Sequence, residues 1–185
     1  QAEAMARQLE RLRQLIEREL HRARLAAAGE PVVQRFHPGE EIPDLIRVLR
    51  QLHLDKALEI EIGKLPSEPL ELDREDMLEL LGNLLDNACR WARQRVRLEL
   101  APREDQSVHI RLEDDGQGVS DTEILQLAQR GVRIDEQSGG HGLGLAIALD
   151  IAQRYGGRLE FSRSHSLGGL RVEVWLHPEP TEGPG

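Results

Sequence analysis

Residues 80–92 read LLGNLLDNACRWA, and the interpretation of the whole sequence depends on this stretch. A helix that turns by about 100° per residue gathers its apolar residues, with one from the preceding turn, on a single arc. The arc comprises Met77, Leu80, Leu81, Leu84, Ala88 and Trp91. A polar stripe borders it, because Asn83, Asn87 and Arg90 follow one another at i, i+4 and i+7. Carboxamides beside a buried face are costly unless something bonds to them, so the stripe is either an ordinary exposed face or part of a binding site.

The composition fits one globular domain with an appendage. The sequence has 185 residues, of which 39% are hydrophobic and 31% charged, and a chain of this length can bury a sizeable core. The net charge of −9 argues against a nucleic-acid-binding surface. A single cysteine, Cys89, excludes an internal disulfide and a cysteine-rich zinc site, and indicates a reducing compartment. No apolar run approaches the roughly 20 residues that cross a bilayer.

Residues 1–29 form the appendage. They are rich in Ala, Leu, Arg and Glu, with apolar residues in alternating steps of four and three, which predicts a long amphipathic helix with a coiled-coil-like seam. Gly29 and Pro31 end this helix. We therefore expect a boundary there, a domain over residues 31–178 and a polar tail over residues 179–185. The sequence opens inside the helical pattern, so we expect it to be a piece of a longer protein.

Periodicity predicts a layered domain after the boundary. The predicted strands are residues 32–36, 57–62, 70–72, 95–100, 108–112, 158–162 and 170–176. The predicted helices are residues 43–54, residues 142–155 and the one through residues 80–92, with Asp73 as the N-cap of the last. The last four strands form two hairpin-like pairs, whose alternation indicates one buried and one wet face. We expect a two-layer α/β sandwich in which helices cover one face of a mixed, largely antiparallel sheet.

Two glycine-rich segments carry candidate chemistry. Residues 113–119, EDDGQGV, follow a predicted strand. Asp114 can accept a hydrogen bond from an exocyclic amine there, and Gly116 and Gly118 allow a sharp turn and the close approach of a flat ligand. Residues 139–145, GGHGLGL, open a helix, where free N–H groups can face phosphate. Each segment has an ordinary alternative, because Asp-Gly pairs mark turns and glycines cap helices.

Together, the order and spacing of these segments resemble the ATP-binding domain of sensor histidine kinases. This domain belongs to the GHKL class, which gyrase, MutL and the heat-shock chaperone ATPases share. Residues 83–90 resemble its N box, with Arg in place of the usual final Lys. Residues 114–118 resemble its first glycine box and residues 140–144 its second, while the pair at 168–169 resembles a late glycine pair before the last strand. The match covers about residues 31–177 and implies the GHKL fold.

Finer features resemble the PhoQ-like subgroup. They are HRARLAA at residues 21–27, EDDG with a second glycine at residues 113–118, and RGVRID at residues 130–135. Residues 1–29 resemble the C-terminal helix of the dimerisation and phosphotransfer bundle. The sequence departs from the family at residues 124–131, where ILQLAQRG stands in place of the usual Phe-rich box.

The resemblance implies a role for each residue of the site. Asn83 would hold Mg²⁺ through its carbonyl oxygen, Asn87 would bond to the phosphates or to a metal-bound water, and Arg90 would pair with a phosphate. Asp114 would accept the adenine amino group. Trp91 would pack on the base, although a place in the core is an equal alternative. The remaining implied nucleotide contacts are Gly116, Gly118, Val119, Arg130, Arg133, Gly140, His141, Gly142, Leu143 and Gly144.

The resemblance also favours phosphoryl transfer over hydrolysis. Residues 129–141 would form a mobile ATP lid, and its Arg130 and Arg133 would act in catalysis with Asn83 and Arg90. In the hydrolytic relatives a Glu stands four residues before the second Asn of the N box, and here that residue is Asn83. A carboxamide cannot act as a general base at neutral pH. The expected activity is therefore that of a protein histidine kinase, in which positioning and Mg²⁺ supply most of the catalysis.

The nucleophile of such a kinase is a His followed by an acidic residue and, a few residues later, a Pro. None of the seven His fits this pattern, and His21, on the predicted N-terminal helix, is followed by Arg. We therefore expect the ATP-binding catalytic domain of a bacterial two-component sensor histidine kinase that acts on a His of an upstream helix outside this sequence. We do not expect this chain to phosphorylate itself.

The expected ligands are ATP and Mg²⁺. The expected partners are a response regulator and the protein's own upstream dimerisation helix, and no nucleic acid. The expected location is the cytoplasmic portion of a bacterial inner-membrane homodimer. Two alternatives stay open: a nucleotide-binding regulatory or dimerisation module without transfer activity, and a hydrolytic GHKL ATPase, against which the missing Glu argues.

Overall fold

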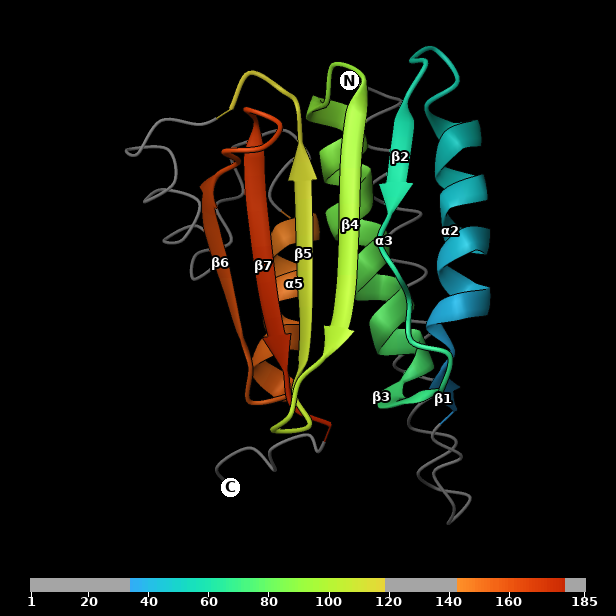
Figure 1. The fold of residues 1–185 in the computed structure, drawn as a ribbon, viewed down its shortest axis with the longest axis vertical. Coiled ribbons are helices and arrows are strands. Elements are labelled where there is room, and N and C mark those ends of the chain that lie inside the picture. The colour runs from blue at the N-terminus through green and yellow to red at the C-terminus, as the bar shows by residue number, and fades with distance from the viewer. Residues whose placement is uncertain (1–33, 119–142, 179–185) are drawn as a thin grey trace.

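A computed structural model describes residues 34–118 and 143–178 as a five-stranded sheet, a separate two-stranded pair and three helices (Figure 1). The strands are β1 (Arg35–Phe36), β2 (Glu59–Ile62), β3 (Leu70–Asp73), β4 (Arg95–Pro102), β5 (Val108–Asp114), β6 (Arg158–Arg163) and β7 (Leu170–Leu176). The helices are α2 (Pro38–Leu52), α3 (Arg74–Trp91) and α5 (Leu143–Arg154). The predicted N-terminal helix, ATP lid and polar tail lie outside the described residues.

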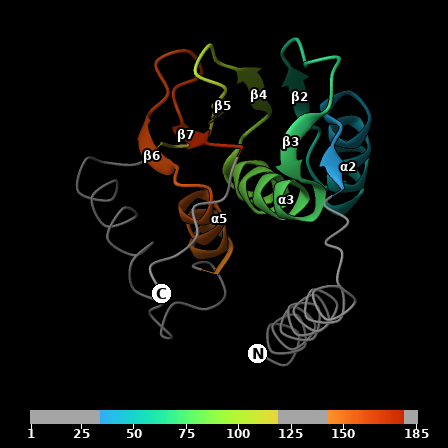
Figure 2. The ribbon, with the colours of Figure 1, turned by 90° about the horizontal axis from the view of Figure 1, so that it is seen from below.

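The sheet confirms the predicted two-layer sandwich. Its strand order is β2-β4-β5-β7-β6, with β2 parallel to β4 and every other neighbouring pair antiparallel. All three helices lie on the same face of the sheet (Figure 2). Burial alternates along β7, as predicted, but β5 is buried at six of its seven positions. β5 is the central strand, and polar partners from neighbouring strands cover its outward side chains. Within the described residues, no helix has the length and apolarity that crossing a membrane requires.

Helix α3 lies in the core, as its apolar arc predicts. Asp73 caps it, because its carboxylate accepts hydrogen bonds from the backbone N–H groups of Glu75 and Asp76 at 2.9 and 3.0 Å. The arc residues up to Ala88 are buried. The alternative that placed Trp91 in the core is wrong, since this residue is 50% exposed. Its main chain lies beside Gly116, beyond the end of β5, so the helix has run past the sheet that covers its earlier turns.

Helix α2 begins five residues earlier than predicted and ends two residues earlier. Pro38 takes the first helical position, where its missing N–H costs nothing. Glu41 stabilises the same turn, because its carboxylate accepts a hydrogen bond from the backbone N–H of His37 at 3.1 Å. Pro43 therefore lies inside the helix, where one ladder hydrogen bond is missing. The strand predicted over residues 57–62 is also shorter, and begins at Glu59.

A buried polar cluster fastens the start of α3 to the end of α5. The Tyr155 hydroxyl donates to Asp76 Oδ2 at 3.1 Å and accepts from the backbone N–H of Asp73 at 3.1 Å. Arg154 completes the cluster with an ion pair to Asp76 at 3.2 Å. The two helices therefore run antiparallel, and the N-terminus of α5 meets the middle of α3.

We expect Gly157→Ala to destabilise the fold by about 1–3 kcal/mol, the usual cost of overpacking. A Cβ at position 157 would overlap the carbonyl of Trp175 and lie 3.0 Å from that of Ala152. The matched control is Gly82→Ala inside α3, where a Cβ would meet only Leu45 at 4.0 Å. That change should stabilise the protein by about 0.5–1 kcal/mol. Urea unfolding measures both, and equal stability of the two variants would contradict the close approach.

Candidate functional site

A buried carboxylate organises the end of β5. Asp114 is 3% exposed. Its Oδ1 accepts hydrogen bonds from the backbone N–H groups of Gly116 at 2.8 Å and Leu170 at 3.2 Å. The backbone carbonyl of Asp114 accepts a further hydrogen bond from the backbone N–H of Gly169 at 3.0 Å. Among the described residues no donor reaches Oδ2. The end of β5 is thus tied to the start of β7, and one carboxylate oxygen keeps its accepting capacity.

The main chain of two glycines packs directly against Asp114. A Cβ at position 169 would overlap both Oδ1 and the carbonyl oxygen of Asp114. One at position 116 would lie 2.6 Å from the Trp91 carbonyl oxygen. Gly118 and Gly168 have φ values of +75° and +93°, in the left-handed region that favours glycine. A side chain is therefore excluded at positions 116 and 169, and the backbone passes close to the Asp114 carboxylate there.

The polar stripe of α3 meets the N-terminus of α5. Asn83 Nδ2 donates to the carbonyl of Glu79 at 2.8 Å, which fixes the orientation of the carboxamide. Its Oδ1 faces Gly144, where a Cβ would lie only 3.0 Å away. Gly144 lies in the first turn of α5, whose backbone N–H groups have no partner within the helix. The structure thus brings Asn83 to a helix N-terminus, a favourable place for anions.

The remaining members of the stripe face outwards. Asn87 is half-buried, and Arg90 is exposed. The Arg90 guanidinium lies 3.3 Å from Asp86 Oδ2, and the other oxygen of Asp86 lies 3.0 Å from His53 Nε2. An exposed ion pair of this kind contributes only about 0–1 kcal/mol, so an anion with better geometry can displace it.

The structure brings five of the predicted site residues together in two places. Asn83 and Gly144 meet at one end, and Trp91, Asp114 and Gly116 meet at the other. Leu143 begins α5, and Gly118 follows β5. The predicted residues that lie outside the described ones are Val119, Arg130, Arg133, Gly140, His141 and Gly142.

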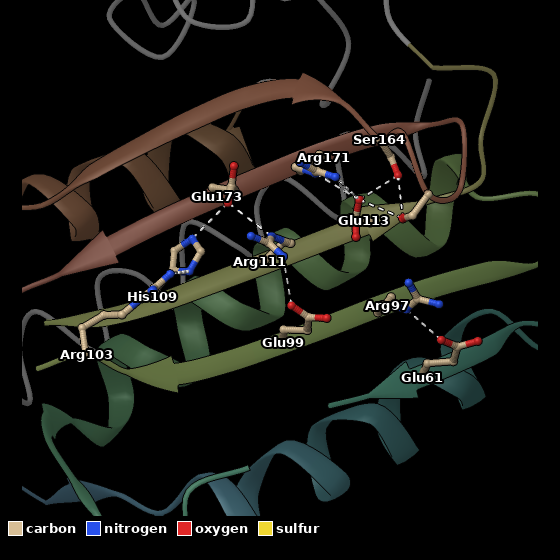
Figure 3. Close-up of polar contacts among 11 residues, drawn as sticks. Glu61, Arg97, Glu99, Arg103, His109, Arg111, Glu113, Ser164, Arg171 and Glu173 are labelled. Atoms are coloured by element: carbon tan, nitrogen blue, oxygen red, sulfur yellow. Dashed lines mark hydrogen bonds and ion pairs between the residues drawn. The ribbon is translucent and has the colours of Figure 1, made fainter. Parts of the chain in front are cut away.

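The acidic neighbours of Asp114 also hold this region together, a role that the sequence pattern did not predict. Glu113 is buried, and its Oε1 accepts from the hydroxyls of Ser164 at 2.8 Å and Ser166 at 3.1 Å and pairs with Arg171 at 3.0 Å (Figure 3). These bonds tie the β6–β7 connection to the end of β5. Burial opposes ionisation of Glu113, but the bonds outweigh it and lower its pKa. The sequence signal for this role was the run of three acidic residues at the end of a buried strand, because each buried carboxylate needs hydrogen-bond donors of its own.

A metal ion at this site would need ligands other than the His, Cys, Asp and Glu side chains of the described residues. In the part of the chain that the structure describes, no group of three or more His, Cys, Asp and Glu side chains could hold a metal. Asn83 Oδ1 is a hard oxygen ligand with a fixed orientation. One such ligand, completed by phosphate oxygens and waters, suits Mg²⁺. The residues therefore fit a magnesium ion that arrives with a phosphorylated ligand.

Comparison with known proteins identifies the class. The family model of histidine kinase-, DNA gyrase B-, and HSP90-like ATPases matches residues 72–180. The chain therefore belongs to this ATPase family, and the predicted GHKL resemblance is confirmed.

Similar proteins of known name are sensor kinases. The chain is 45% identical over 174 residues to the sensor protein kinase CarS of Pseudomonas aeruginosa, a match that covers 94% of this chain and 38% of CarS. It is 34% identical over 182 residues to the virulence sensor histidine kinase PhoQ of Salmonella typhimurium, covering 96% of this chain and 37% of PhoQ. These matches confirm the PhoQ-like resemblance. The chain thus spans well under half the length of these relatives.

Solved structures confirm the fold. The mycobacterial sensor histidine kinase MprB superposes with a TM-score of 0.61 at 22% identity, over 81% of this chain and 100% of that one. Full-length ShkA in complex with AMPPNP gives a TM-score of 0.60 at 25% identity, over 94% of this chain and 37% of that one. The described chain is accordingly a histidine-kinase-type ATPase fold.

Two adjacent aspartates should show opposite pH dependence of stability. Burial raises the pKa of Asp114, with a further contribution from the charge of Asp115. Burial opposes ionisation of Asp115 as well, but three backbone N–H groups and Arg95 outweigh it and lower its pKa. A group whose pKa is raised on folding stabilises the folded state at pH values below its pKa in the unfolded chain. This contribution is lost as the pH rises through its pKa in the folded protein. A group whose pKa is lowered on folding stabilises the folded state at pH values above its pKa in the unfolded chain. This contribution is lost as the pH falls through its pKa in the folded protein.

We therefore expect the stability of Asp114→Asn, relative to the unmodified protein, to rise as pH increases from about 4. The stability of Asp115→Asn, relative to the unmodified protein, should fall as pH increases up to about 4. The loss of stability in this variant is therefore largest at neutral pH. Chemical unfolding at a series of pH values measures both differences. The same sign in both variants would contradict the assignment.

Proposed function

We propose that this chain is the ATP-binding catalytic domain of a two-component sensor histidine kinase, which binds ATP with Mg²⁺ and directs the γ-phosphate to a His on another helix. The observation that carries the proposal is the contact between Asn83 Oδ1 and Gly144. It joins the stripe of α3 to a helix N-terminus. At the other end of the same stripe, Trp91 lies against Gly116 beside the buried Asp114.

The Asp114 end suits an adenine base. Asp114 Oδ2 would accept a hydrogen bond from the exocyclic amino group, and Oδ1 is already held by two backbone N–H groups. The carbonyl that guanine carries in place of this amino group cannot donate to a carboxylate. The backbone at positions 116 and 169 would let the flat base approach closely, and the exposed Trp91 ring could cover it.

The Asn83 end suits phosphates. The N-terminus of α5 offers unpaired N–H groups and a positive dipole end, and Asn87 and Arg90 add donors along α3. Asn83 Oδ1 would hold Mg²⁺, which when bound would neutralise charge on the phosphates. The Asn83 carboxamide would not remove a proton from water, so the site would favour transfer to a protein nucleophile over hydrolysis.

In the whole protein, the phosphate would pass from the accepting His to a response regulator. Residues 1–29 would contribute to the dimerisation bundle of a membrane-bound parent, with this domain on its cytoplasmic side. The match to the model of the ATPase family supports the ATP-binding part of the proposal. The names of the two relatives, sensor kinases both, support the same direction.

We expect micromolar to millimolar binding of ATP that strengthens with Mg²⁺, which corresponds to about −4 to −8 kcal/mol. Titration of a fluorescent ATP analogue with and without Mg²⁺ measures it. Asn83→Ala should chiefly weaken the Mg²⁺ dependence, and Asp114→Ala should reduce the preference for ATP over GTP. Asp44→Ala, on the exposed side of α2, is the control and should bind normally. If both site variants lose the same property, the division of roles is wrong. If the folded protein binds no ATP, the proposed function is wrong.

We also expect that the chain alone does not label itself with γ-labelled ATP. Transfer requires the nucleophile within about 3–3.5 Å of the reacting phosphorus. None of the seven His has the acidic neighbour and following Pro of a phosphoacceptor. Label should appear only on an added fragment that carries such a His. Label on the chain alone that disappears in His21→Ala would contradict this prediction.

A further inference from the structure

The connection between α3 and β4 is held from one side by a lysine. We call residues 89–95 the α3–β4 junction. Lys56, which lies between α2 and β2, donates through Nζ to the carbonyl oxygens of Cys89 at 3.2 Å, Arg90, and Ala92 at 3.2 Å. The last carbonyls of a helix have no partner within it. A cation is favoured there by the helix dipole as well.

An aspartate holds the same junction by accepting hydrogen bonds from the backbone N–H groups of the junction. Asp115 Oδ1 accepts from the backbone N–H groups of Arg93 at 2.9 Å, Gln94 at 3.0 Å and Arg95 at 2.9 Å. The backbone N–H of Asp115 donates to the carbonyl of Arg95 at 3.1 Å, which closes the ring of bonds. One cation on the carbonyls and one anion on the amides thus fix seven consecutive residues.

The junction lies directly against the candidate site. The Trp91 carbonyl lies so close to Gly116 that a Cβ there would be 2.6 Å from its oxygen. Lys56 bonds the carbonyls on either side of this residue, at Arg90 and Ala92. Asp115 stands in the chain between Asp114 and Gly116. Any displacement of the junction would therefore move Trp91 and Arg90 relative to Asp114.

We propose that Lys56 and Asp115 are positioning residues of the nucleotide site, which act together by holding the α3–β4 junction against the first glycine segment. This inference rests on the proposed function. Neither side chain needs to touch the nucleotide. Their effect passes through the backbone that carries Arg90 and Trp91 on one side and Asp114 and Gly116 on the other.

The test compares Lys56→Met and Asp115→Ala with two matched controls. Lys64→Met removes the only other lysine, which is exposed in the connection between β2 and β3. Asp105→Ala removes another backbone cap, since the Asp105 carboxylate accepts from the N–H of Ser107 at 3.0 Å at the opposite end of the β4–β5 hairpin. Each variant is titrated with ATP and with GTP in Mg²⁺, at a temperature where its own unfolding curve shows it fully folded.

We expect Lys56→Met and Asp115→Ala each to raise the Kd for ATP about tenfold, which is about 1.4 kcal/mol. The preference for ATP over GTP should shrink in both, because Asp114 loses its fixed position relative to the base. Lys56→Arg, which keeps charge and donors, should recover part of the affinity. The two controls should bind like the unmodified protein.

A purely structural role would lower stability and leave the folded variants with unchanged Kd and unchanged base preference, and this result would overturn the inference. If Lys56→Met or Asp115→Ala does not fold, the same two measurements on the conservative variants Lys56→Arg and Asp115→Asn decide between the two roles. Failure of the proposed function is distinct, because it appears as absent ATP binding in the unmodified protein, and the inference then fails with it.

Discussion

The rest of the structure depends on the bonding of one buried carboxylate, that of Asp114. Its Oδ1 is held by the N–H groups of Gly116 and Leu170, and no side chain fits at position 169 beside it. These two facts place the end of β5, the start of β7 and the glycine-rich turn at fixed distances from one another. Since Gly116 also lies against the Trp91 carbonyl, the same turn meets the last residue of α3. A polar group buried at this depth must be bonded, and meeting that need orders three separate segments.

Three consecutive acids each assemble a different part of this region. Glu113 binds the connection between β6 and β7, Asp114 binds the turn that follows it, and Asp115 binds the α3–β4 junction. Neighbouring negative charges would repel one another, and the charge of Asp115 does help to raise the pKa of Asp114. The repulsion is offset because Glu113 and Asp115 each have several donors of their own, which lower their pKa values in spite of burial.

The sequence was informative where structure depends on local pattern. The periodicity of α3, its cap at Asp73 and the alternation of β4 to β7 led to the observed layers. It was uninformative where a contact joins distant residues. Lys56 bonds carbonyls 33 to 36 positions away, and nothing in its own neighbourhood indicates this. The exposure of Trp91 depends on where the sheet ends, which helical periodicity cannot report. The start of α2 was misplaced because both Pro38 and Pro43 suit a first turn, and the earlier one takes it.

The hydrogen bonds and ion pairs of the acidic residues explain how an acidic protein could accept the phosphates of the proposed nucleotide. The net charge of −9 would repel phosphates if the acids near the site were free. Three described acids near it are instead engaged: Asp115 with backbone amides, Glu113 with Arg171 and two hydroxyls, and Asp86 with Arg90 and His53. Among the described residues, the N-terminus of α5 and the exposed guanidinium of Arg90, whose bond to Asp86 is weak, remain available to an anion. Local pairing of charge, rather than the total, therefore decides which ligand this surface can accept.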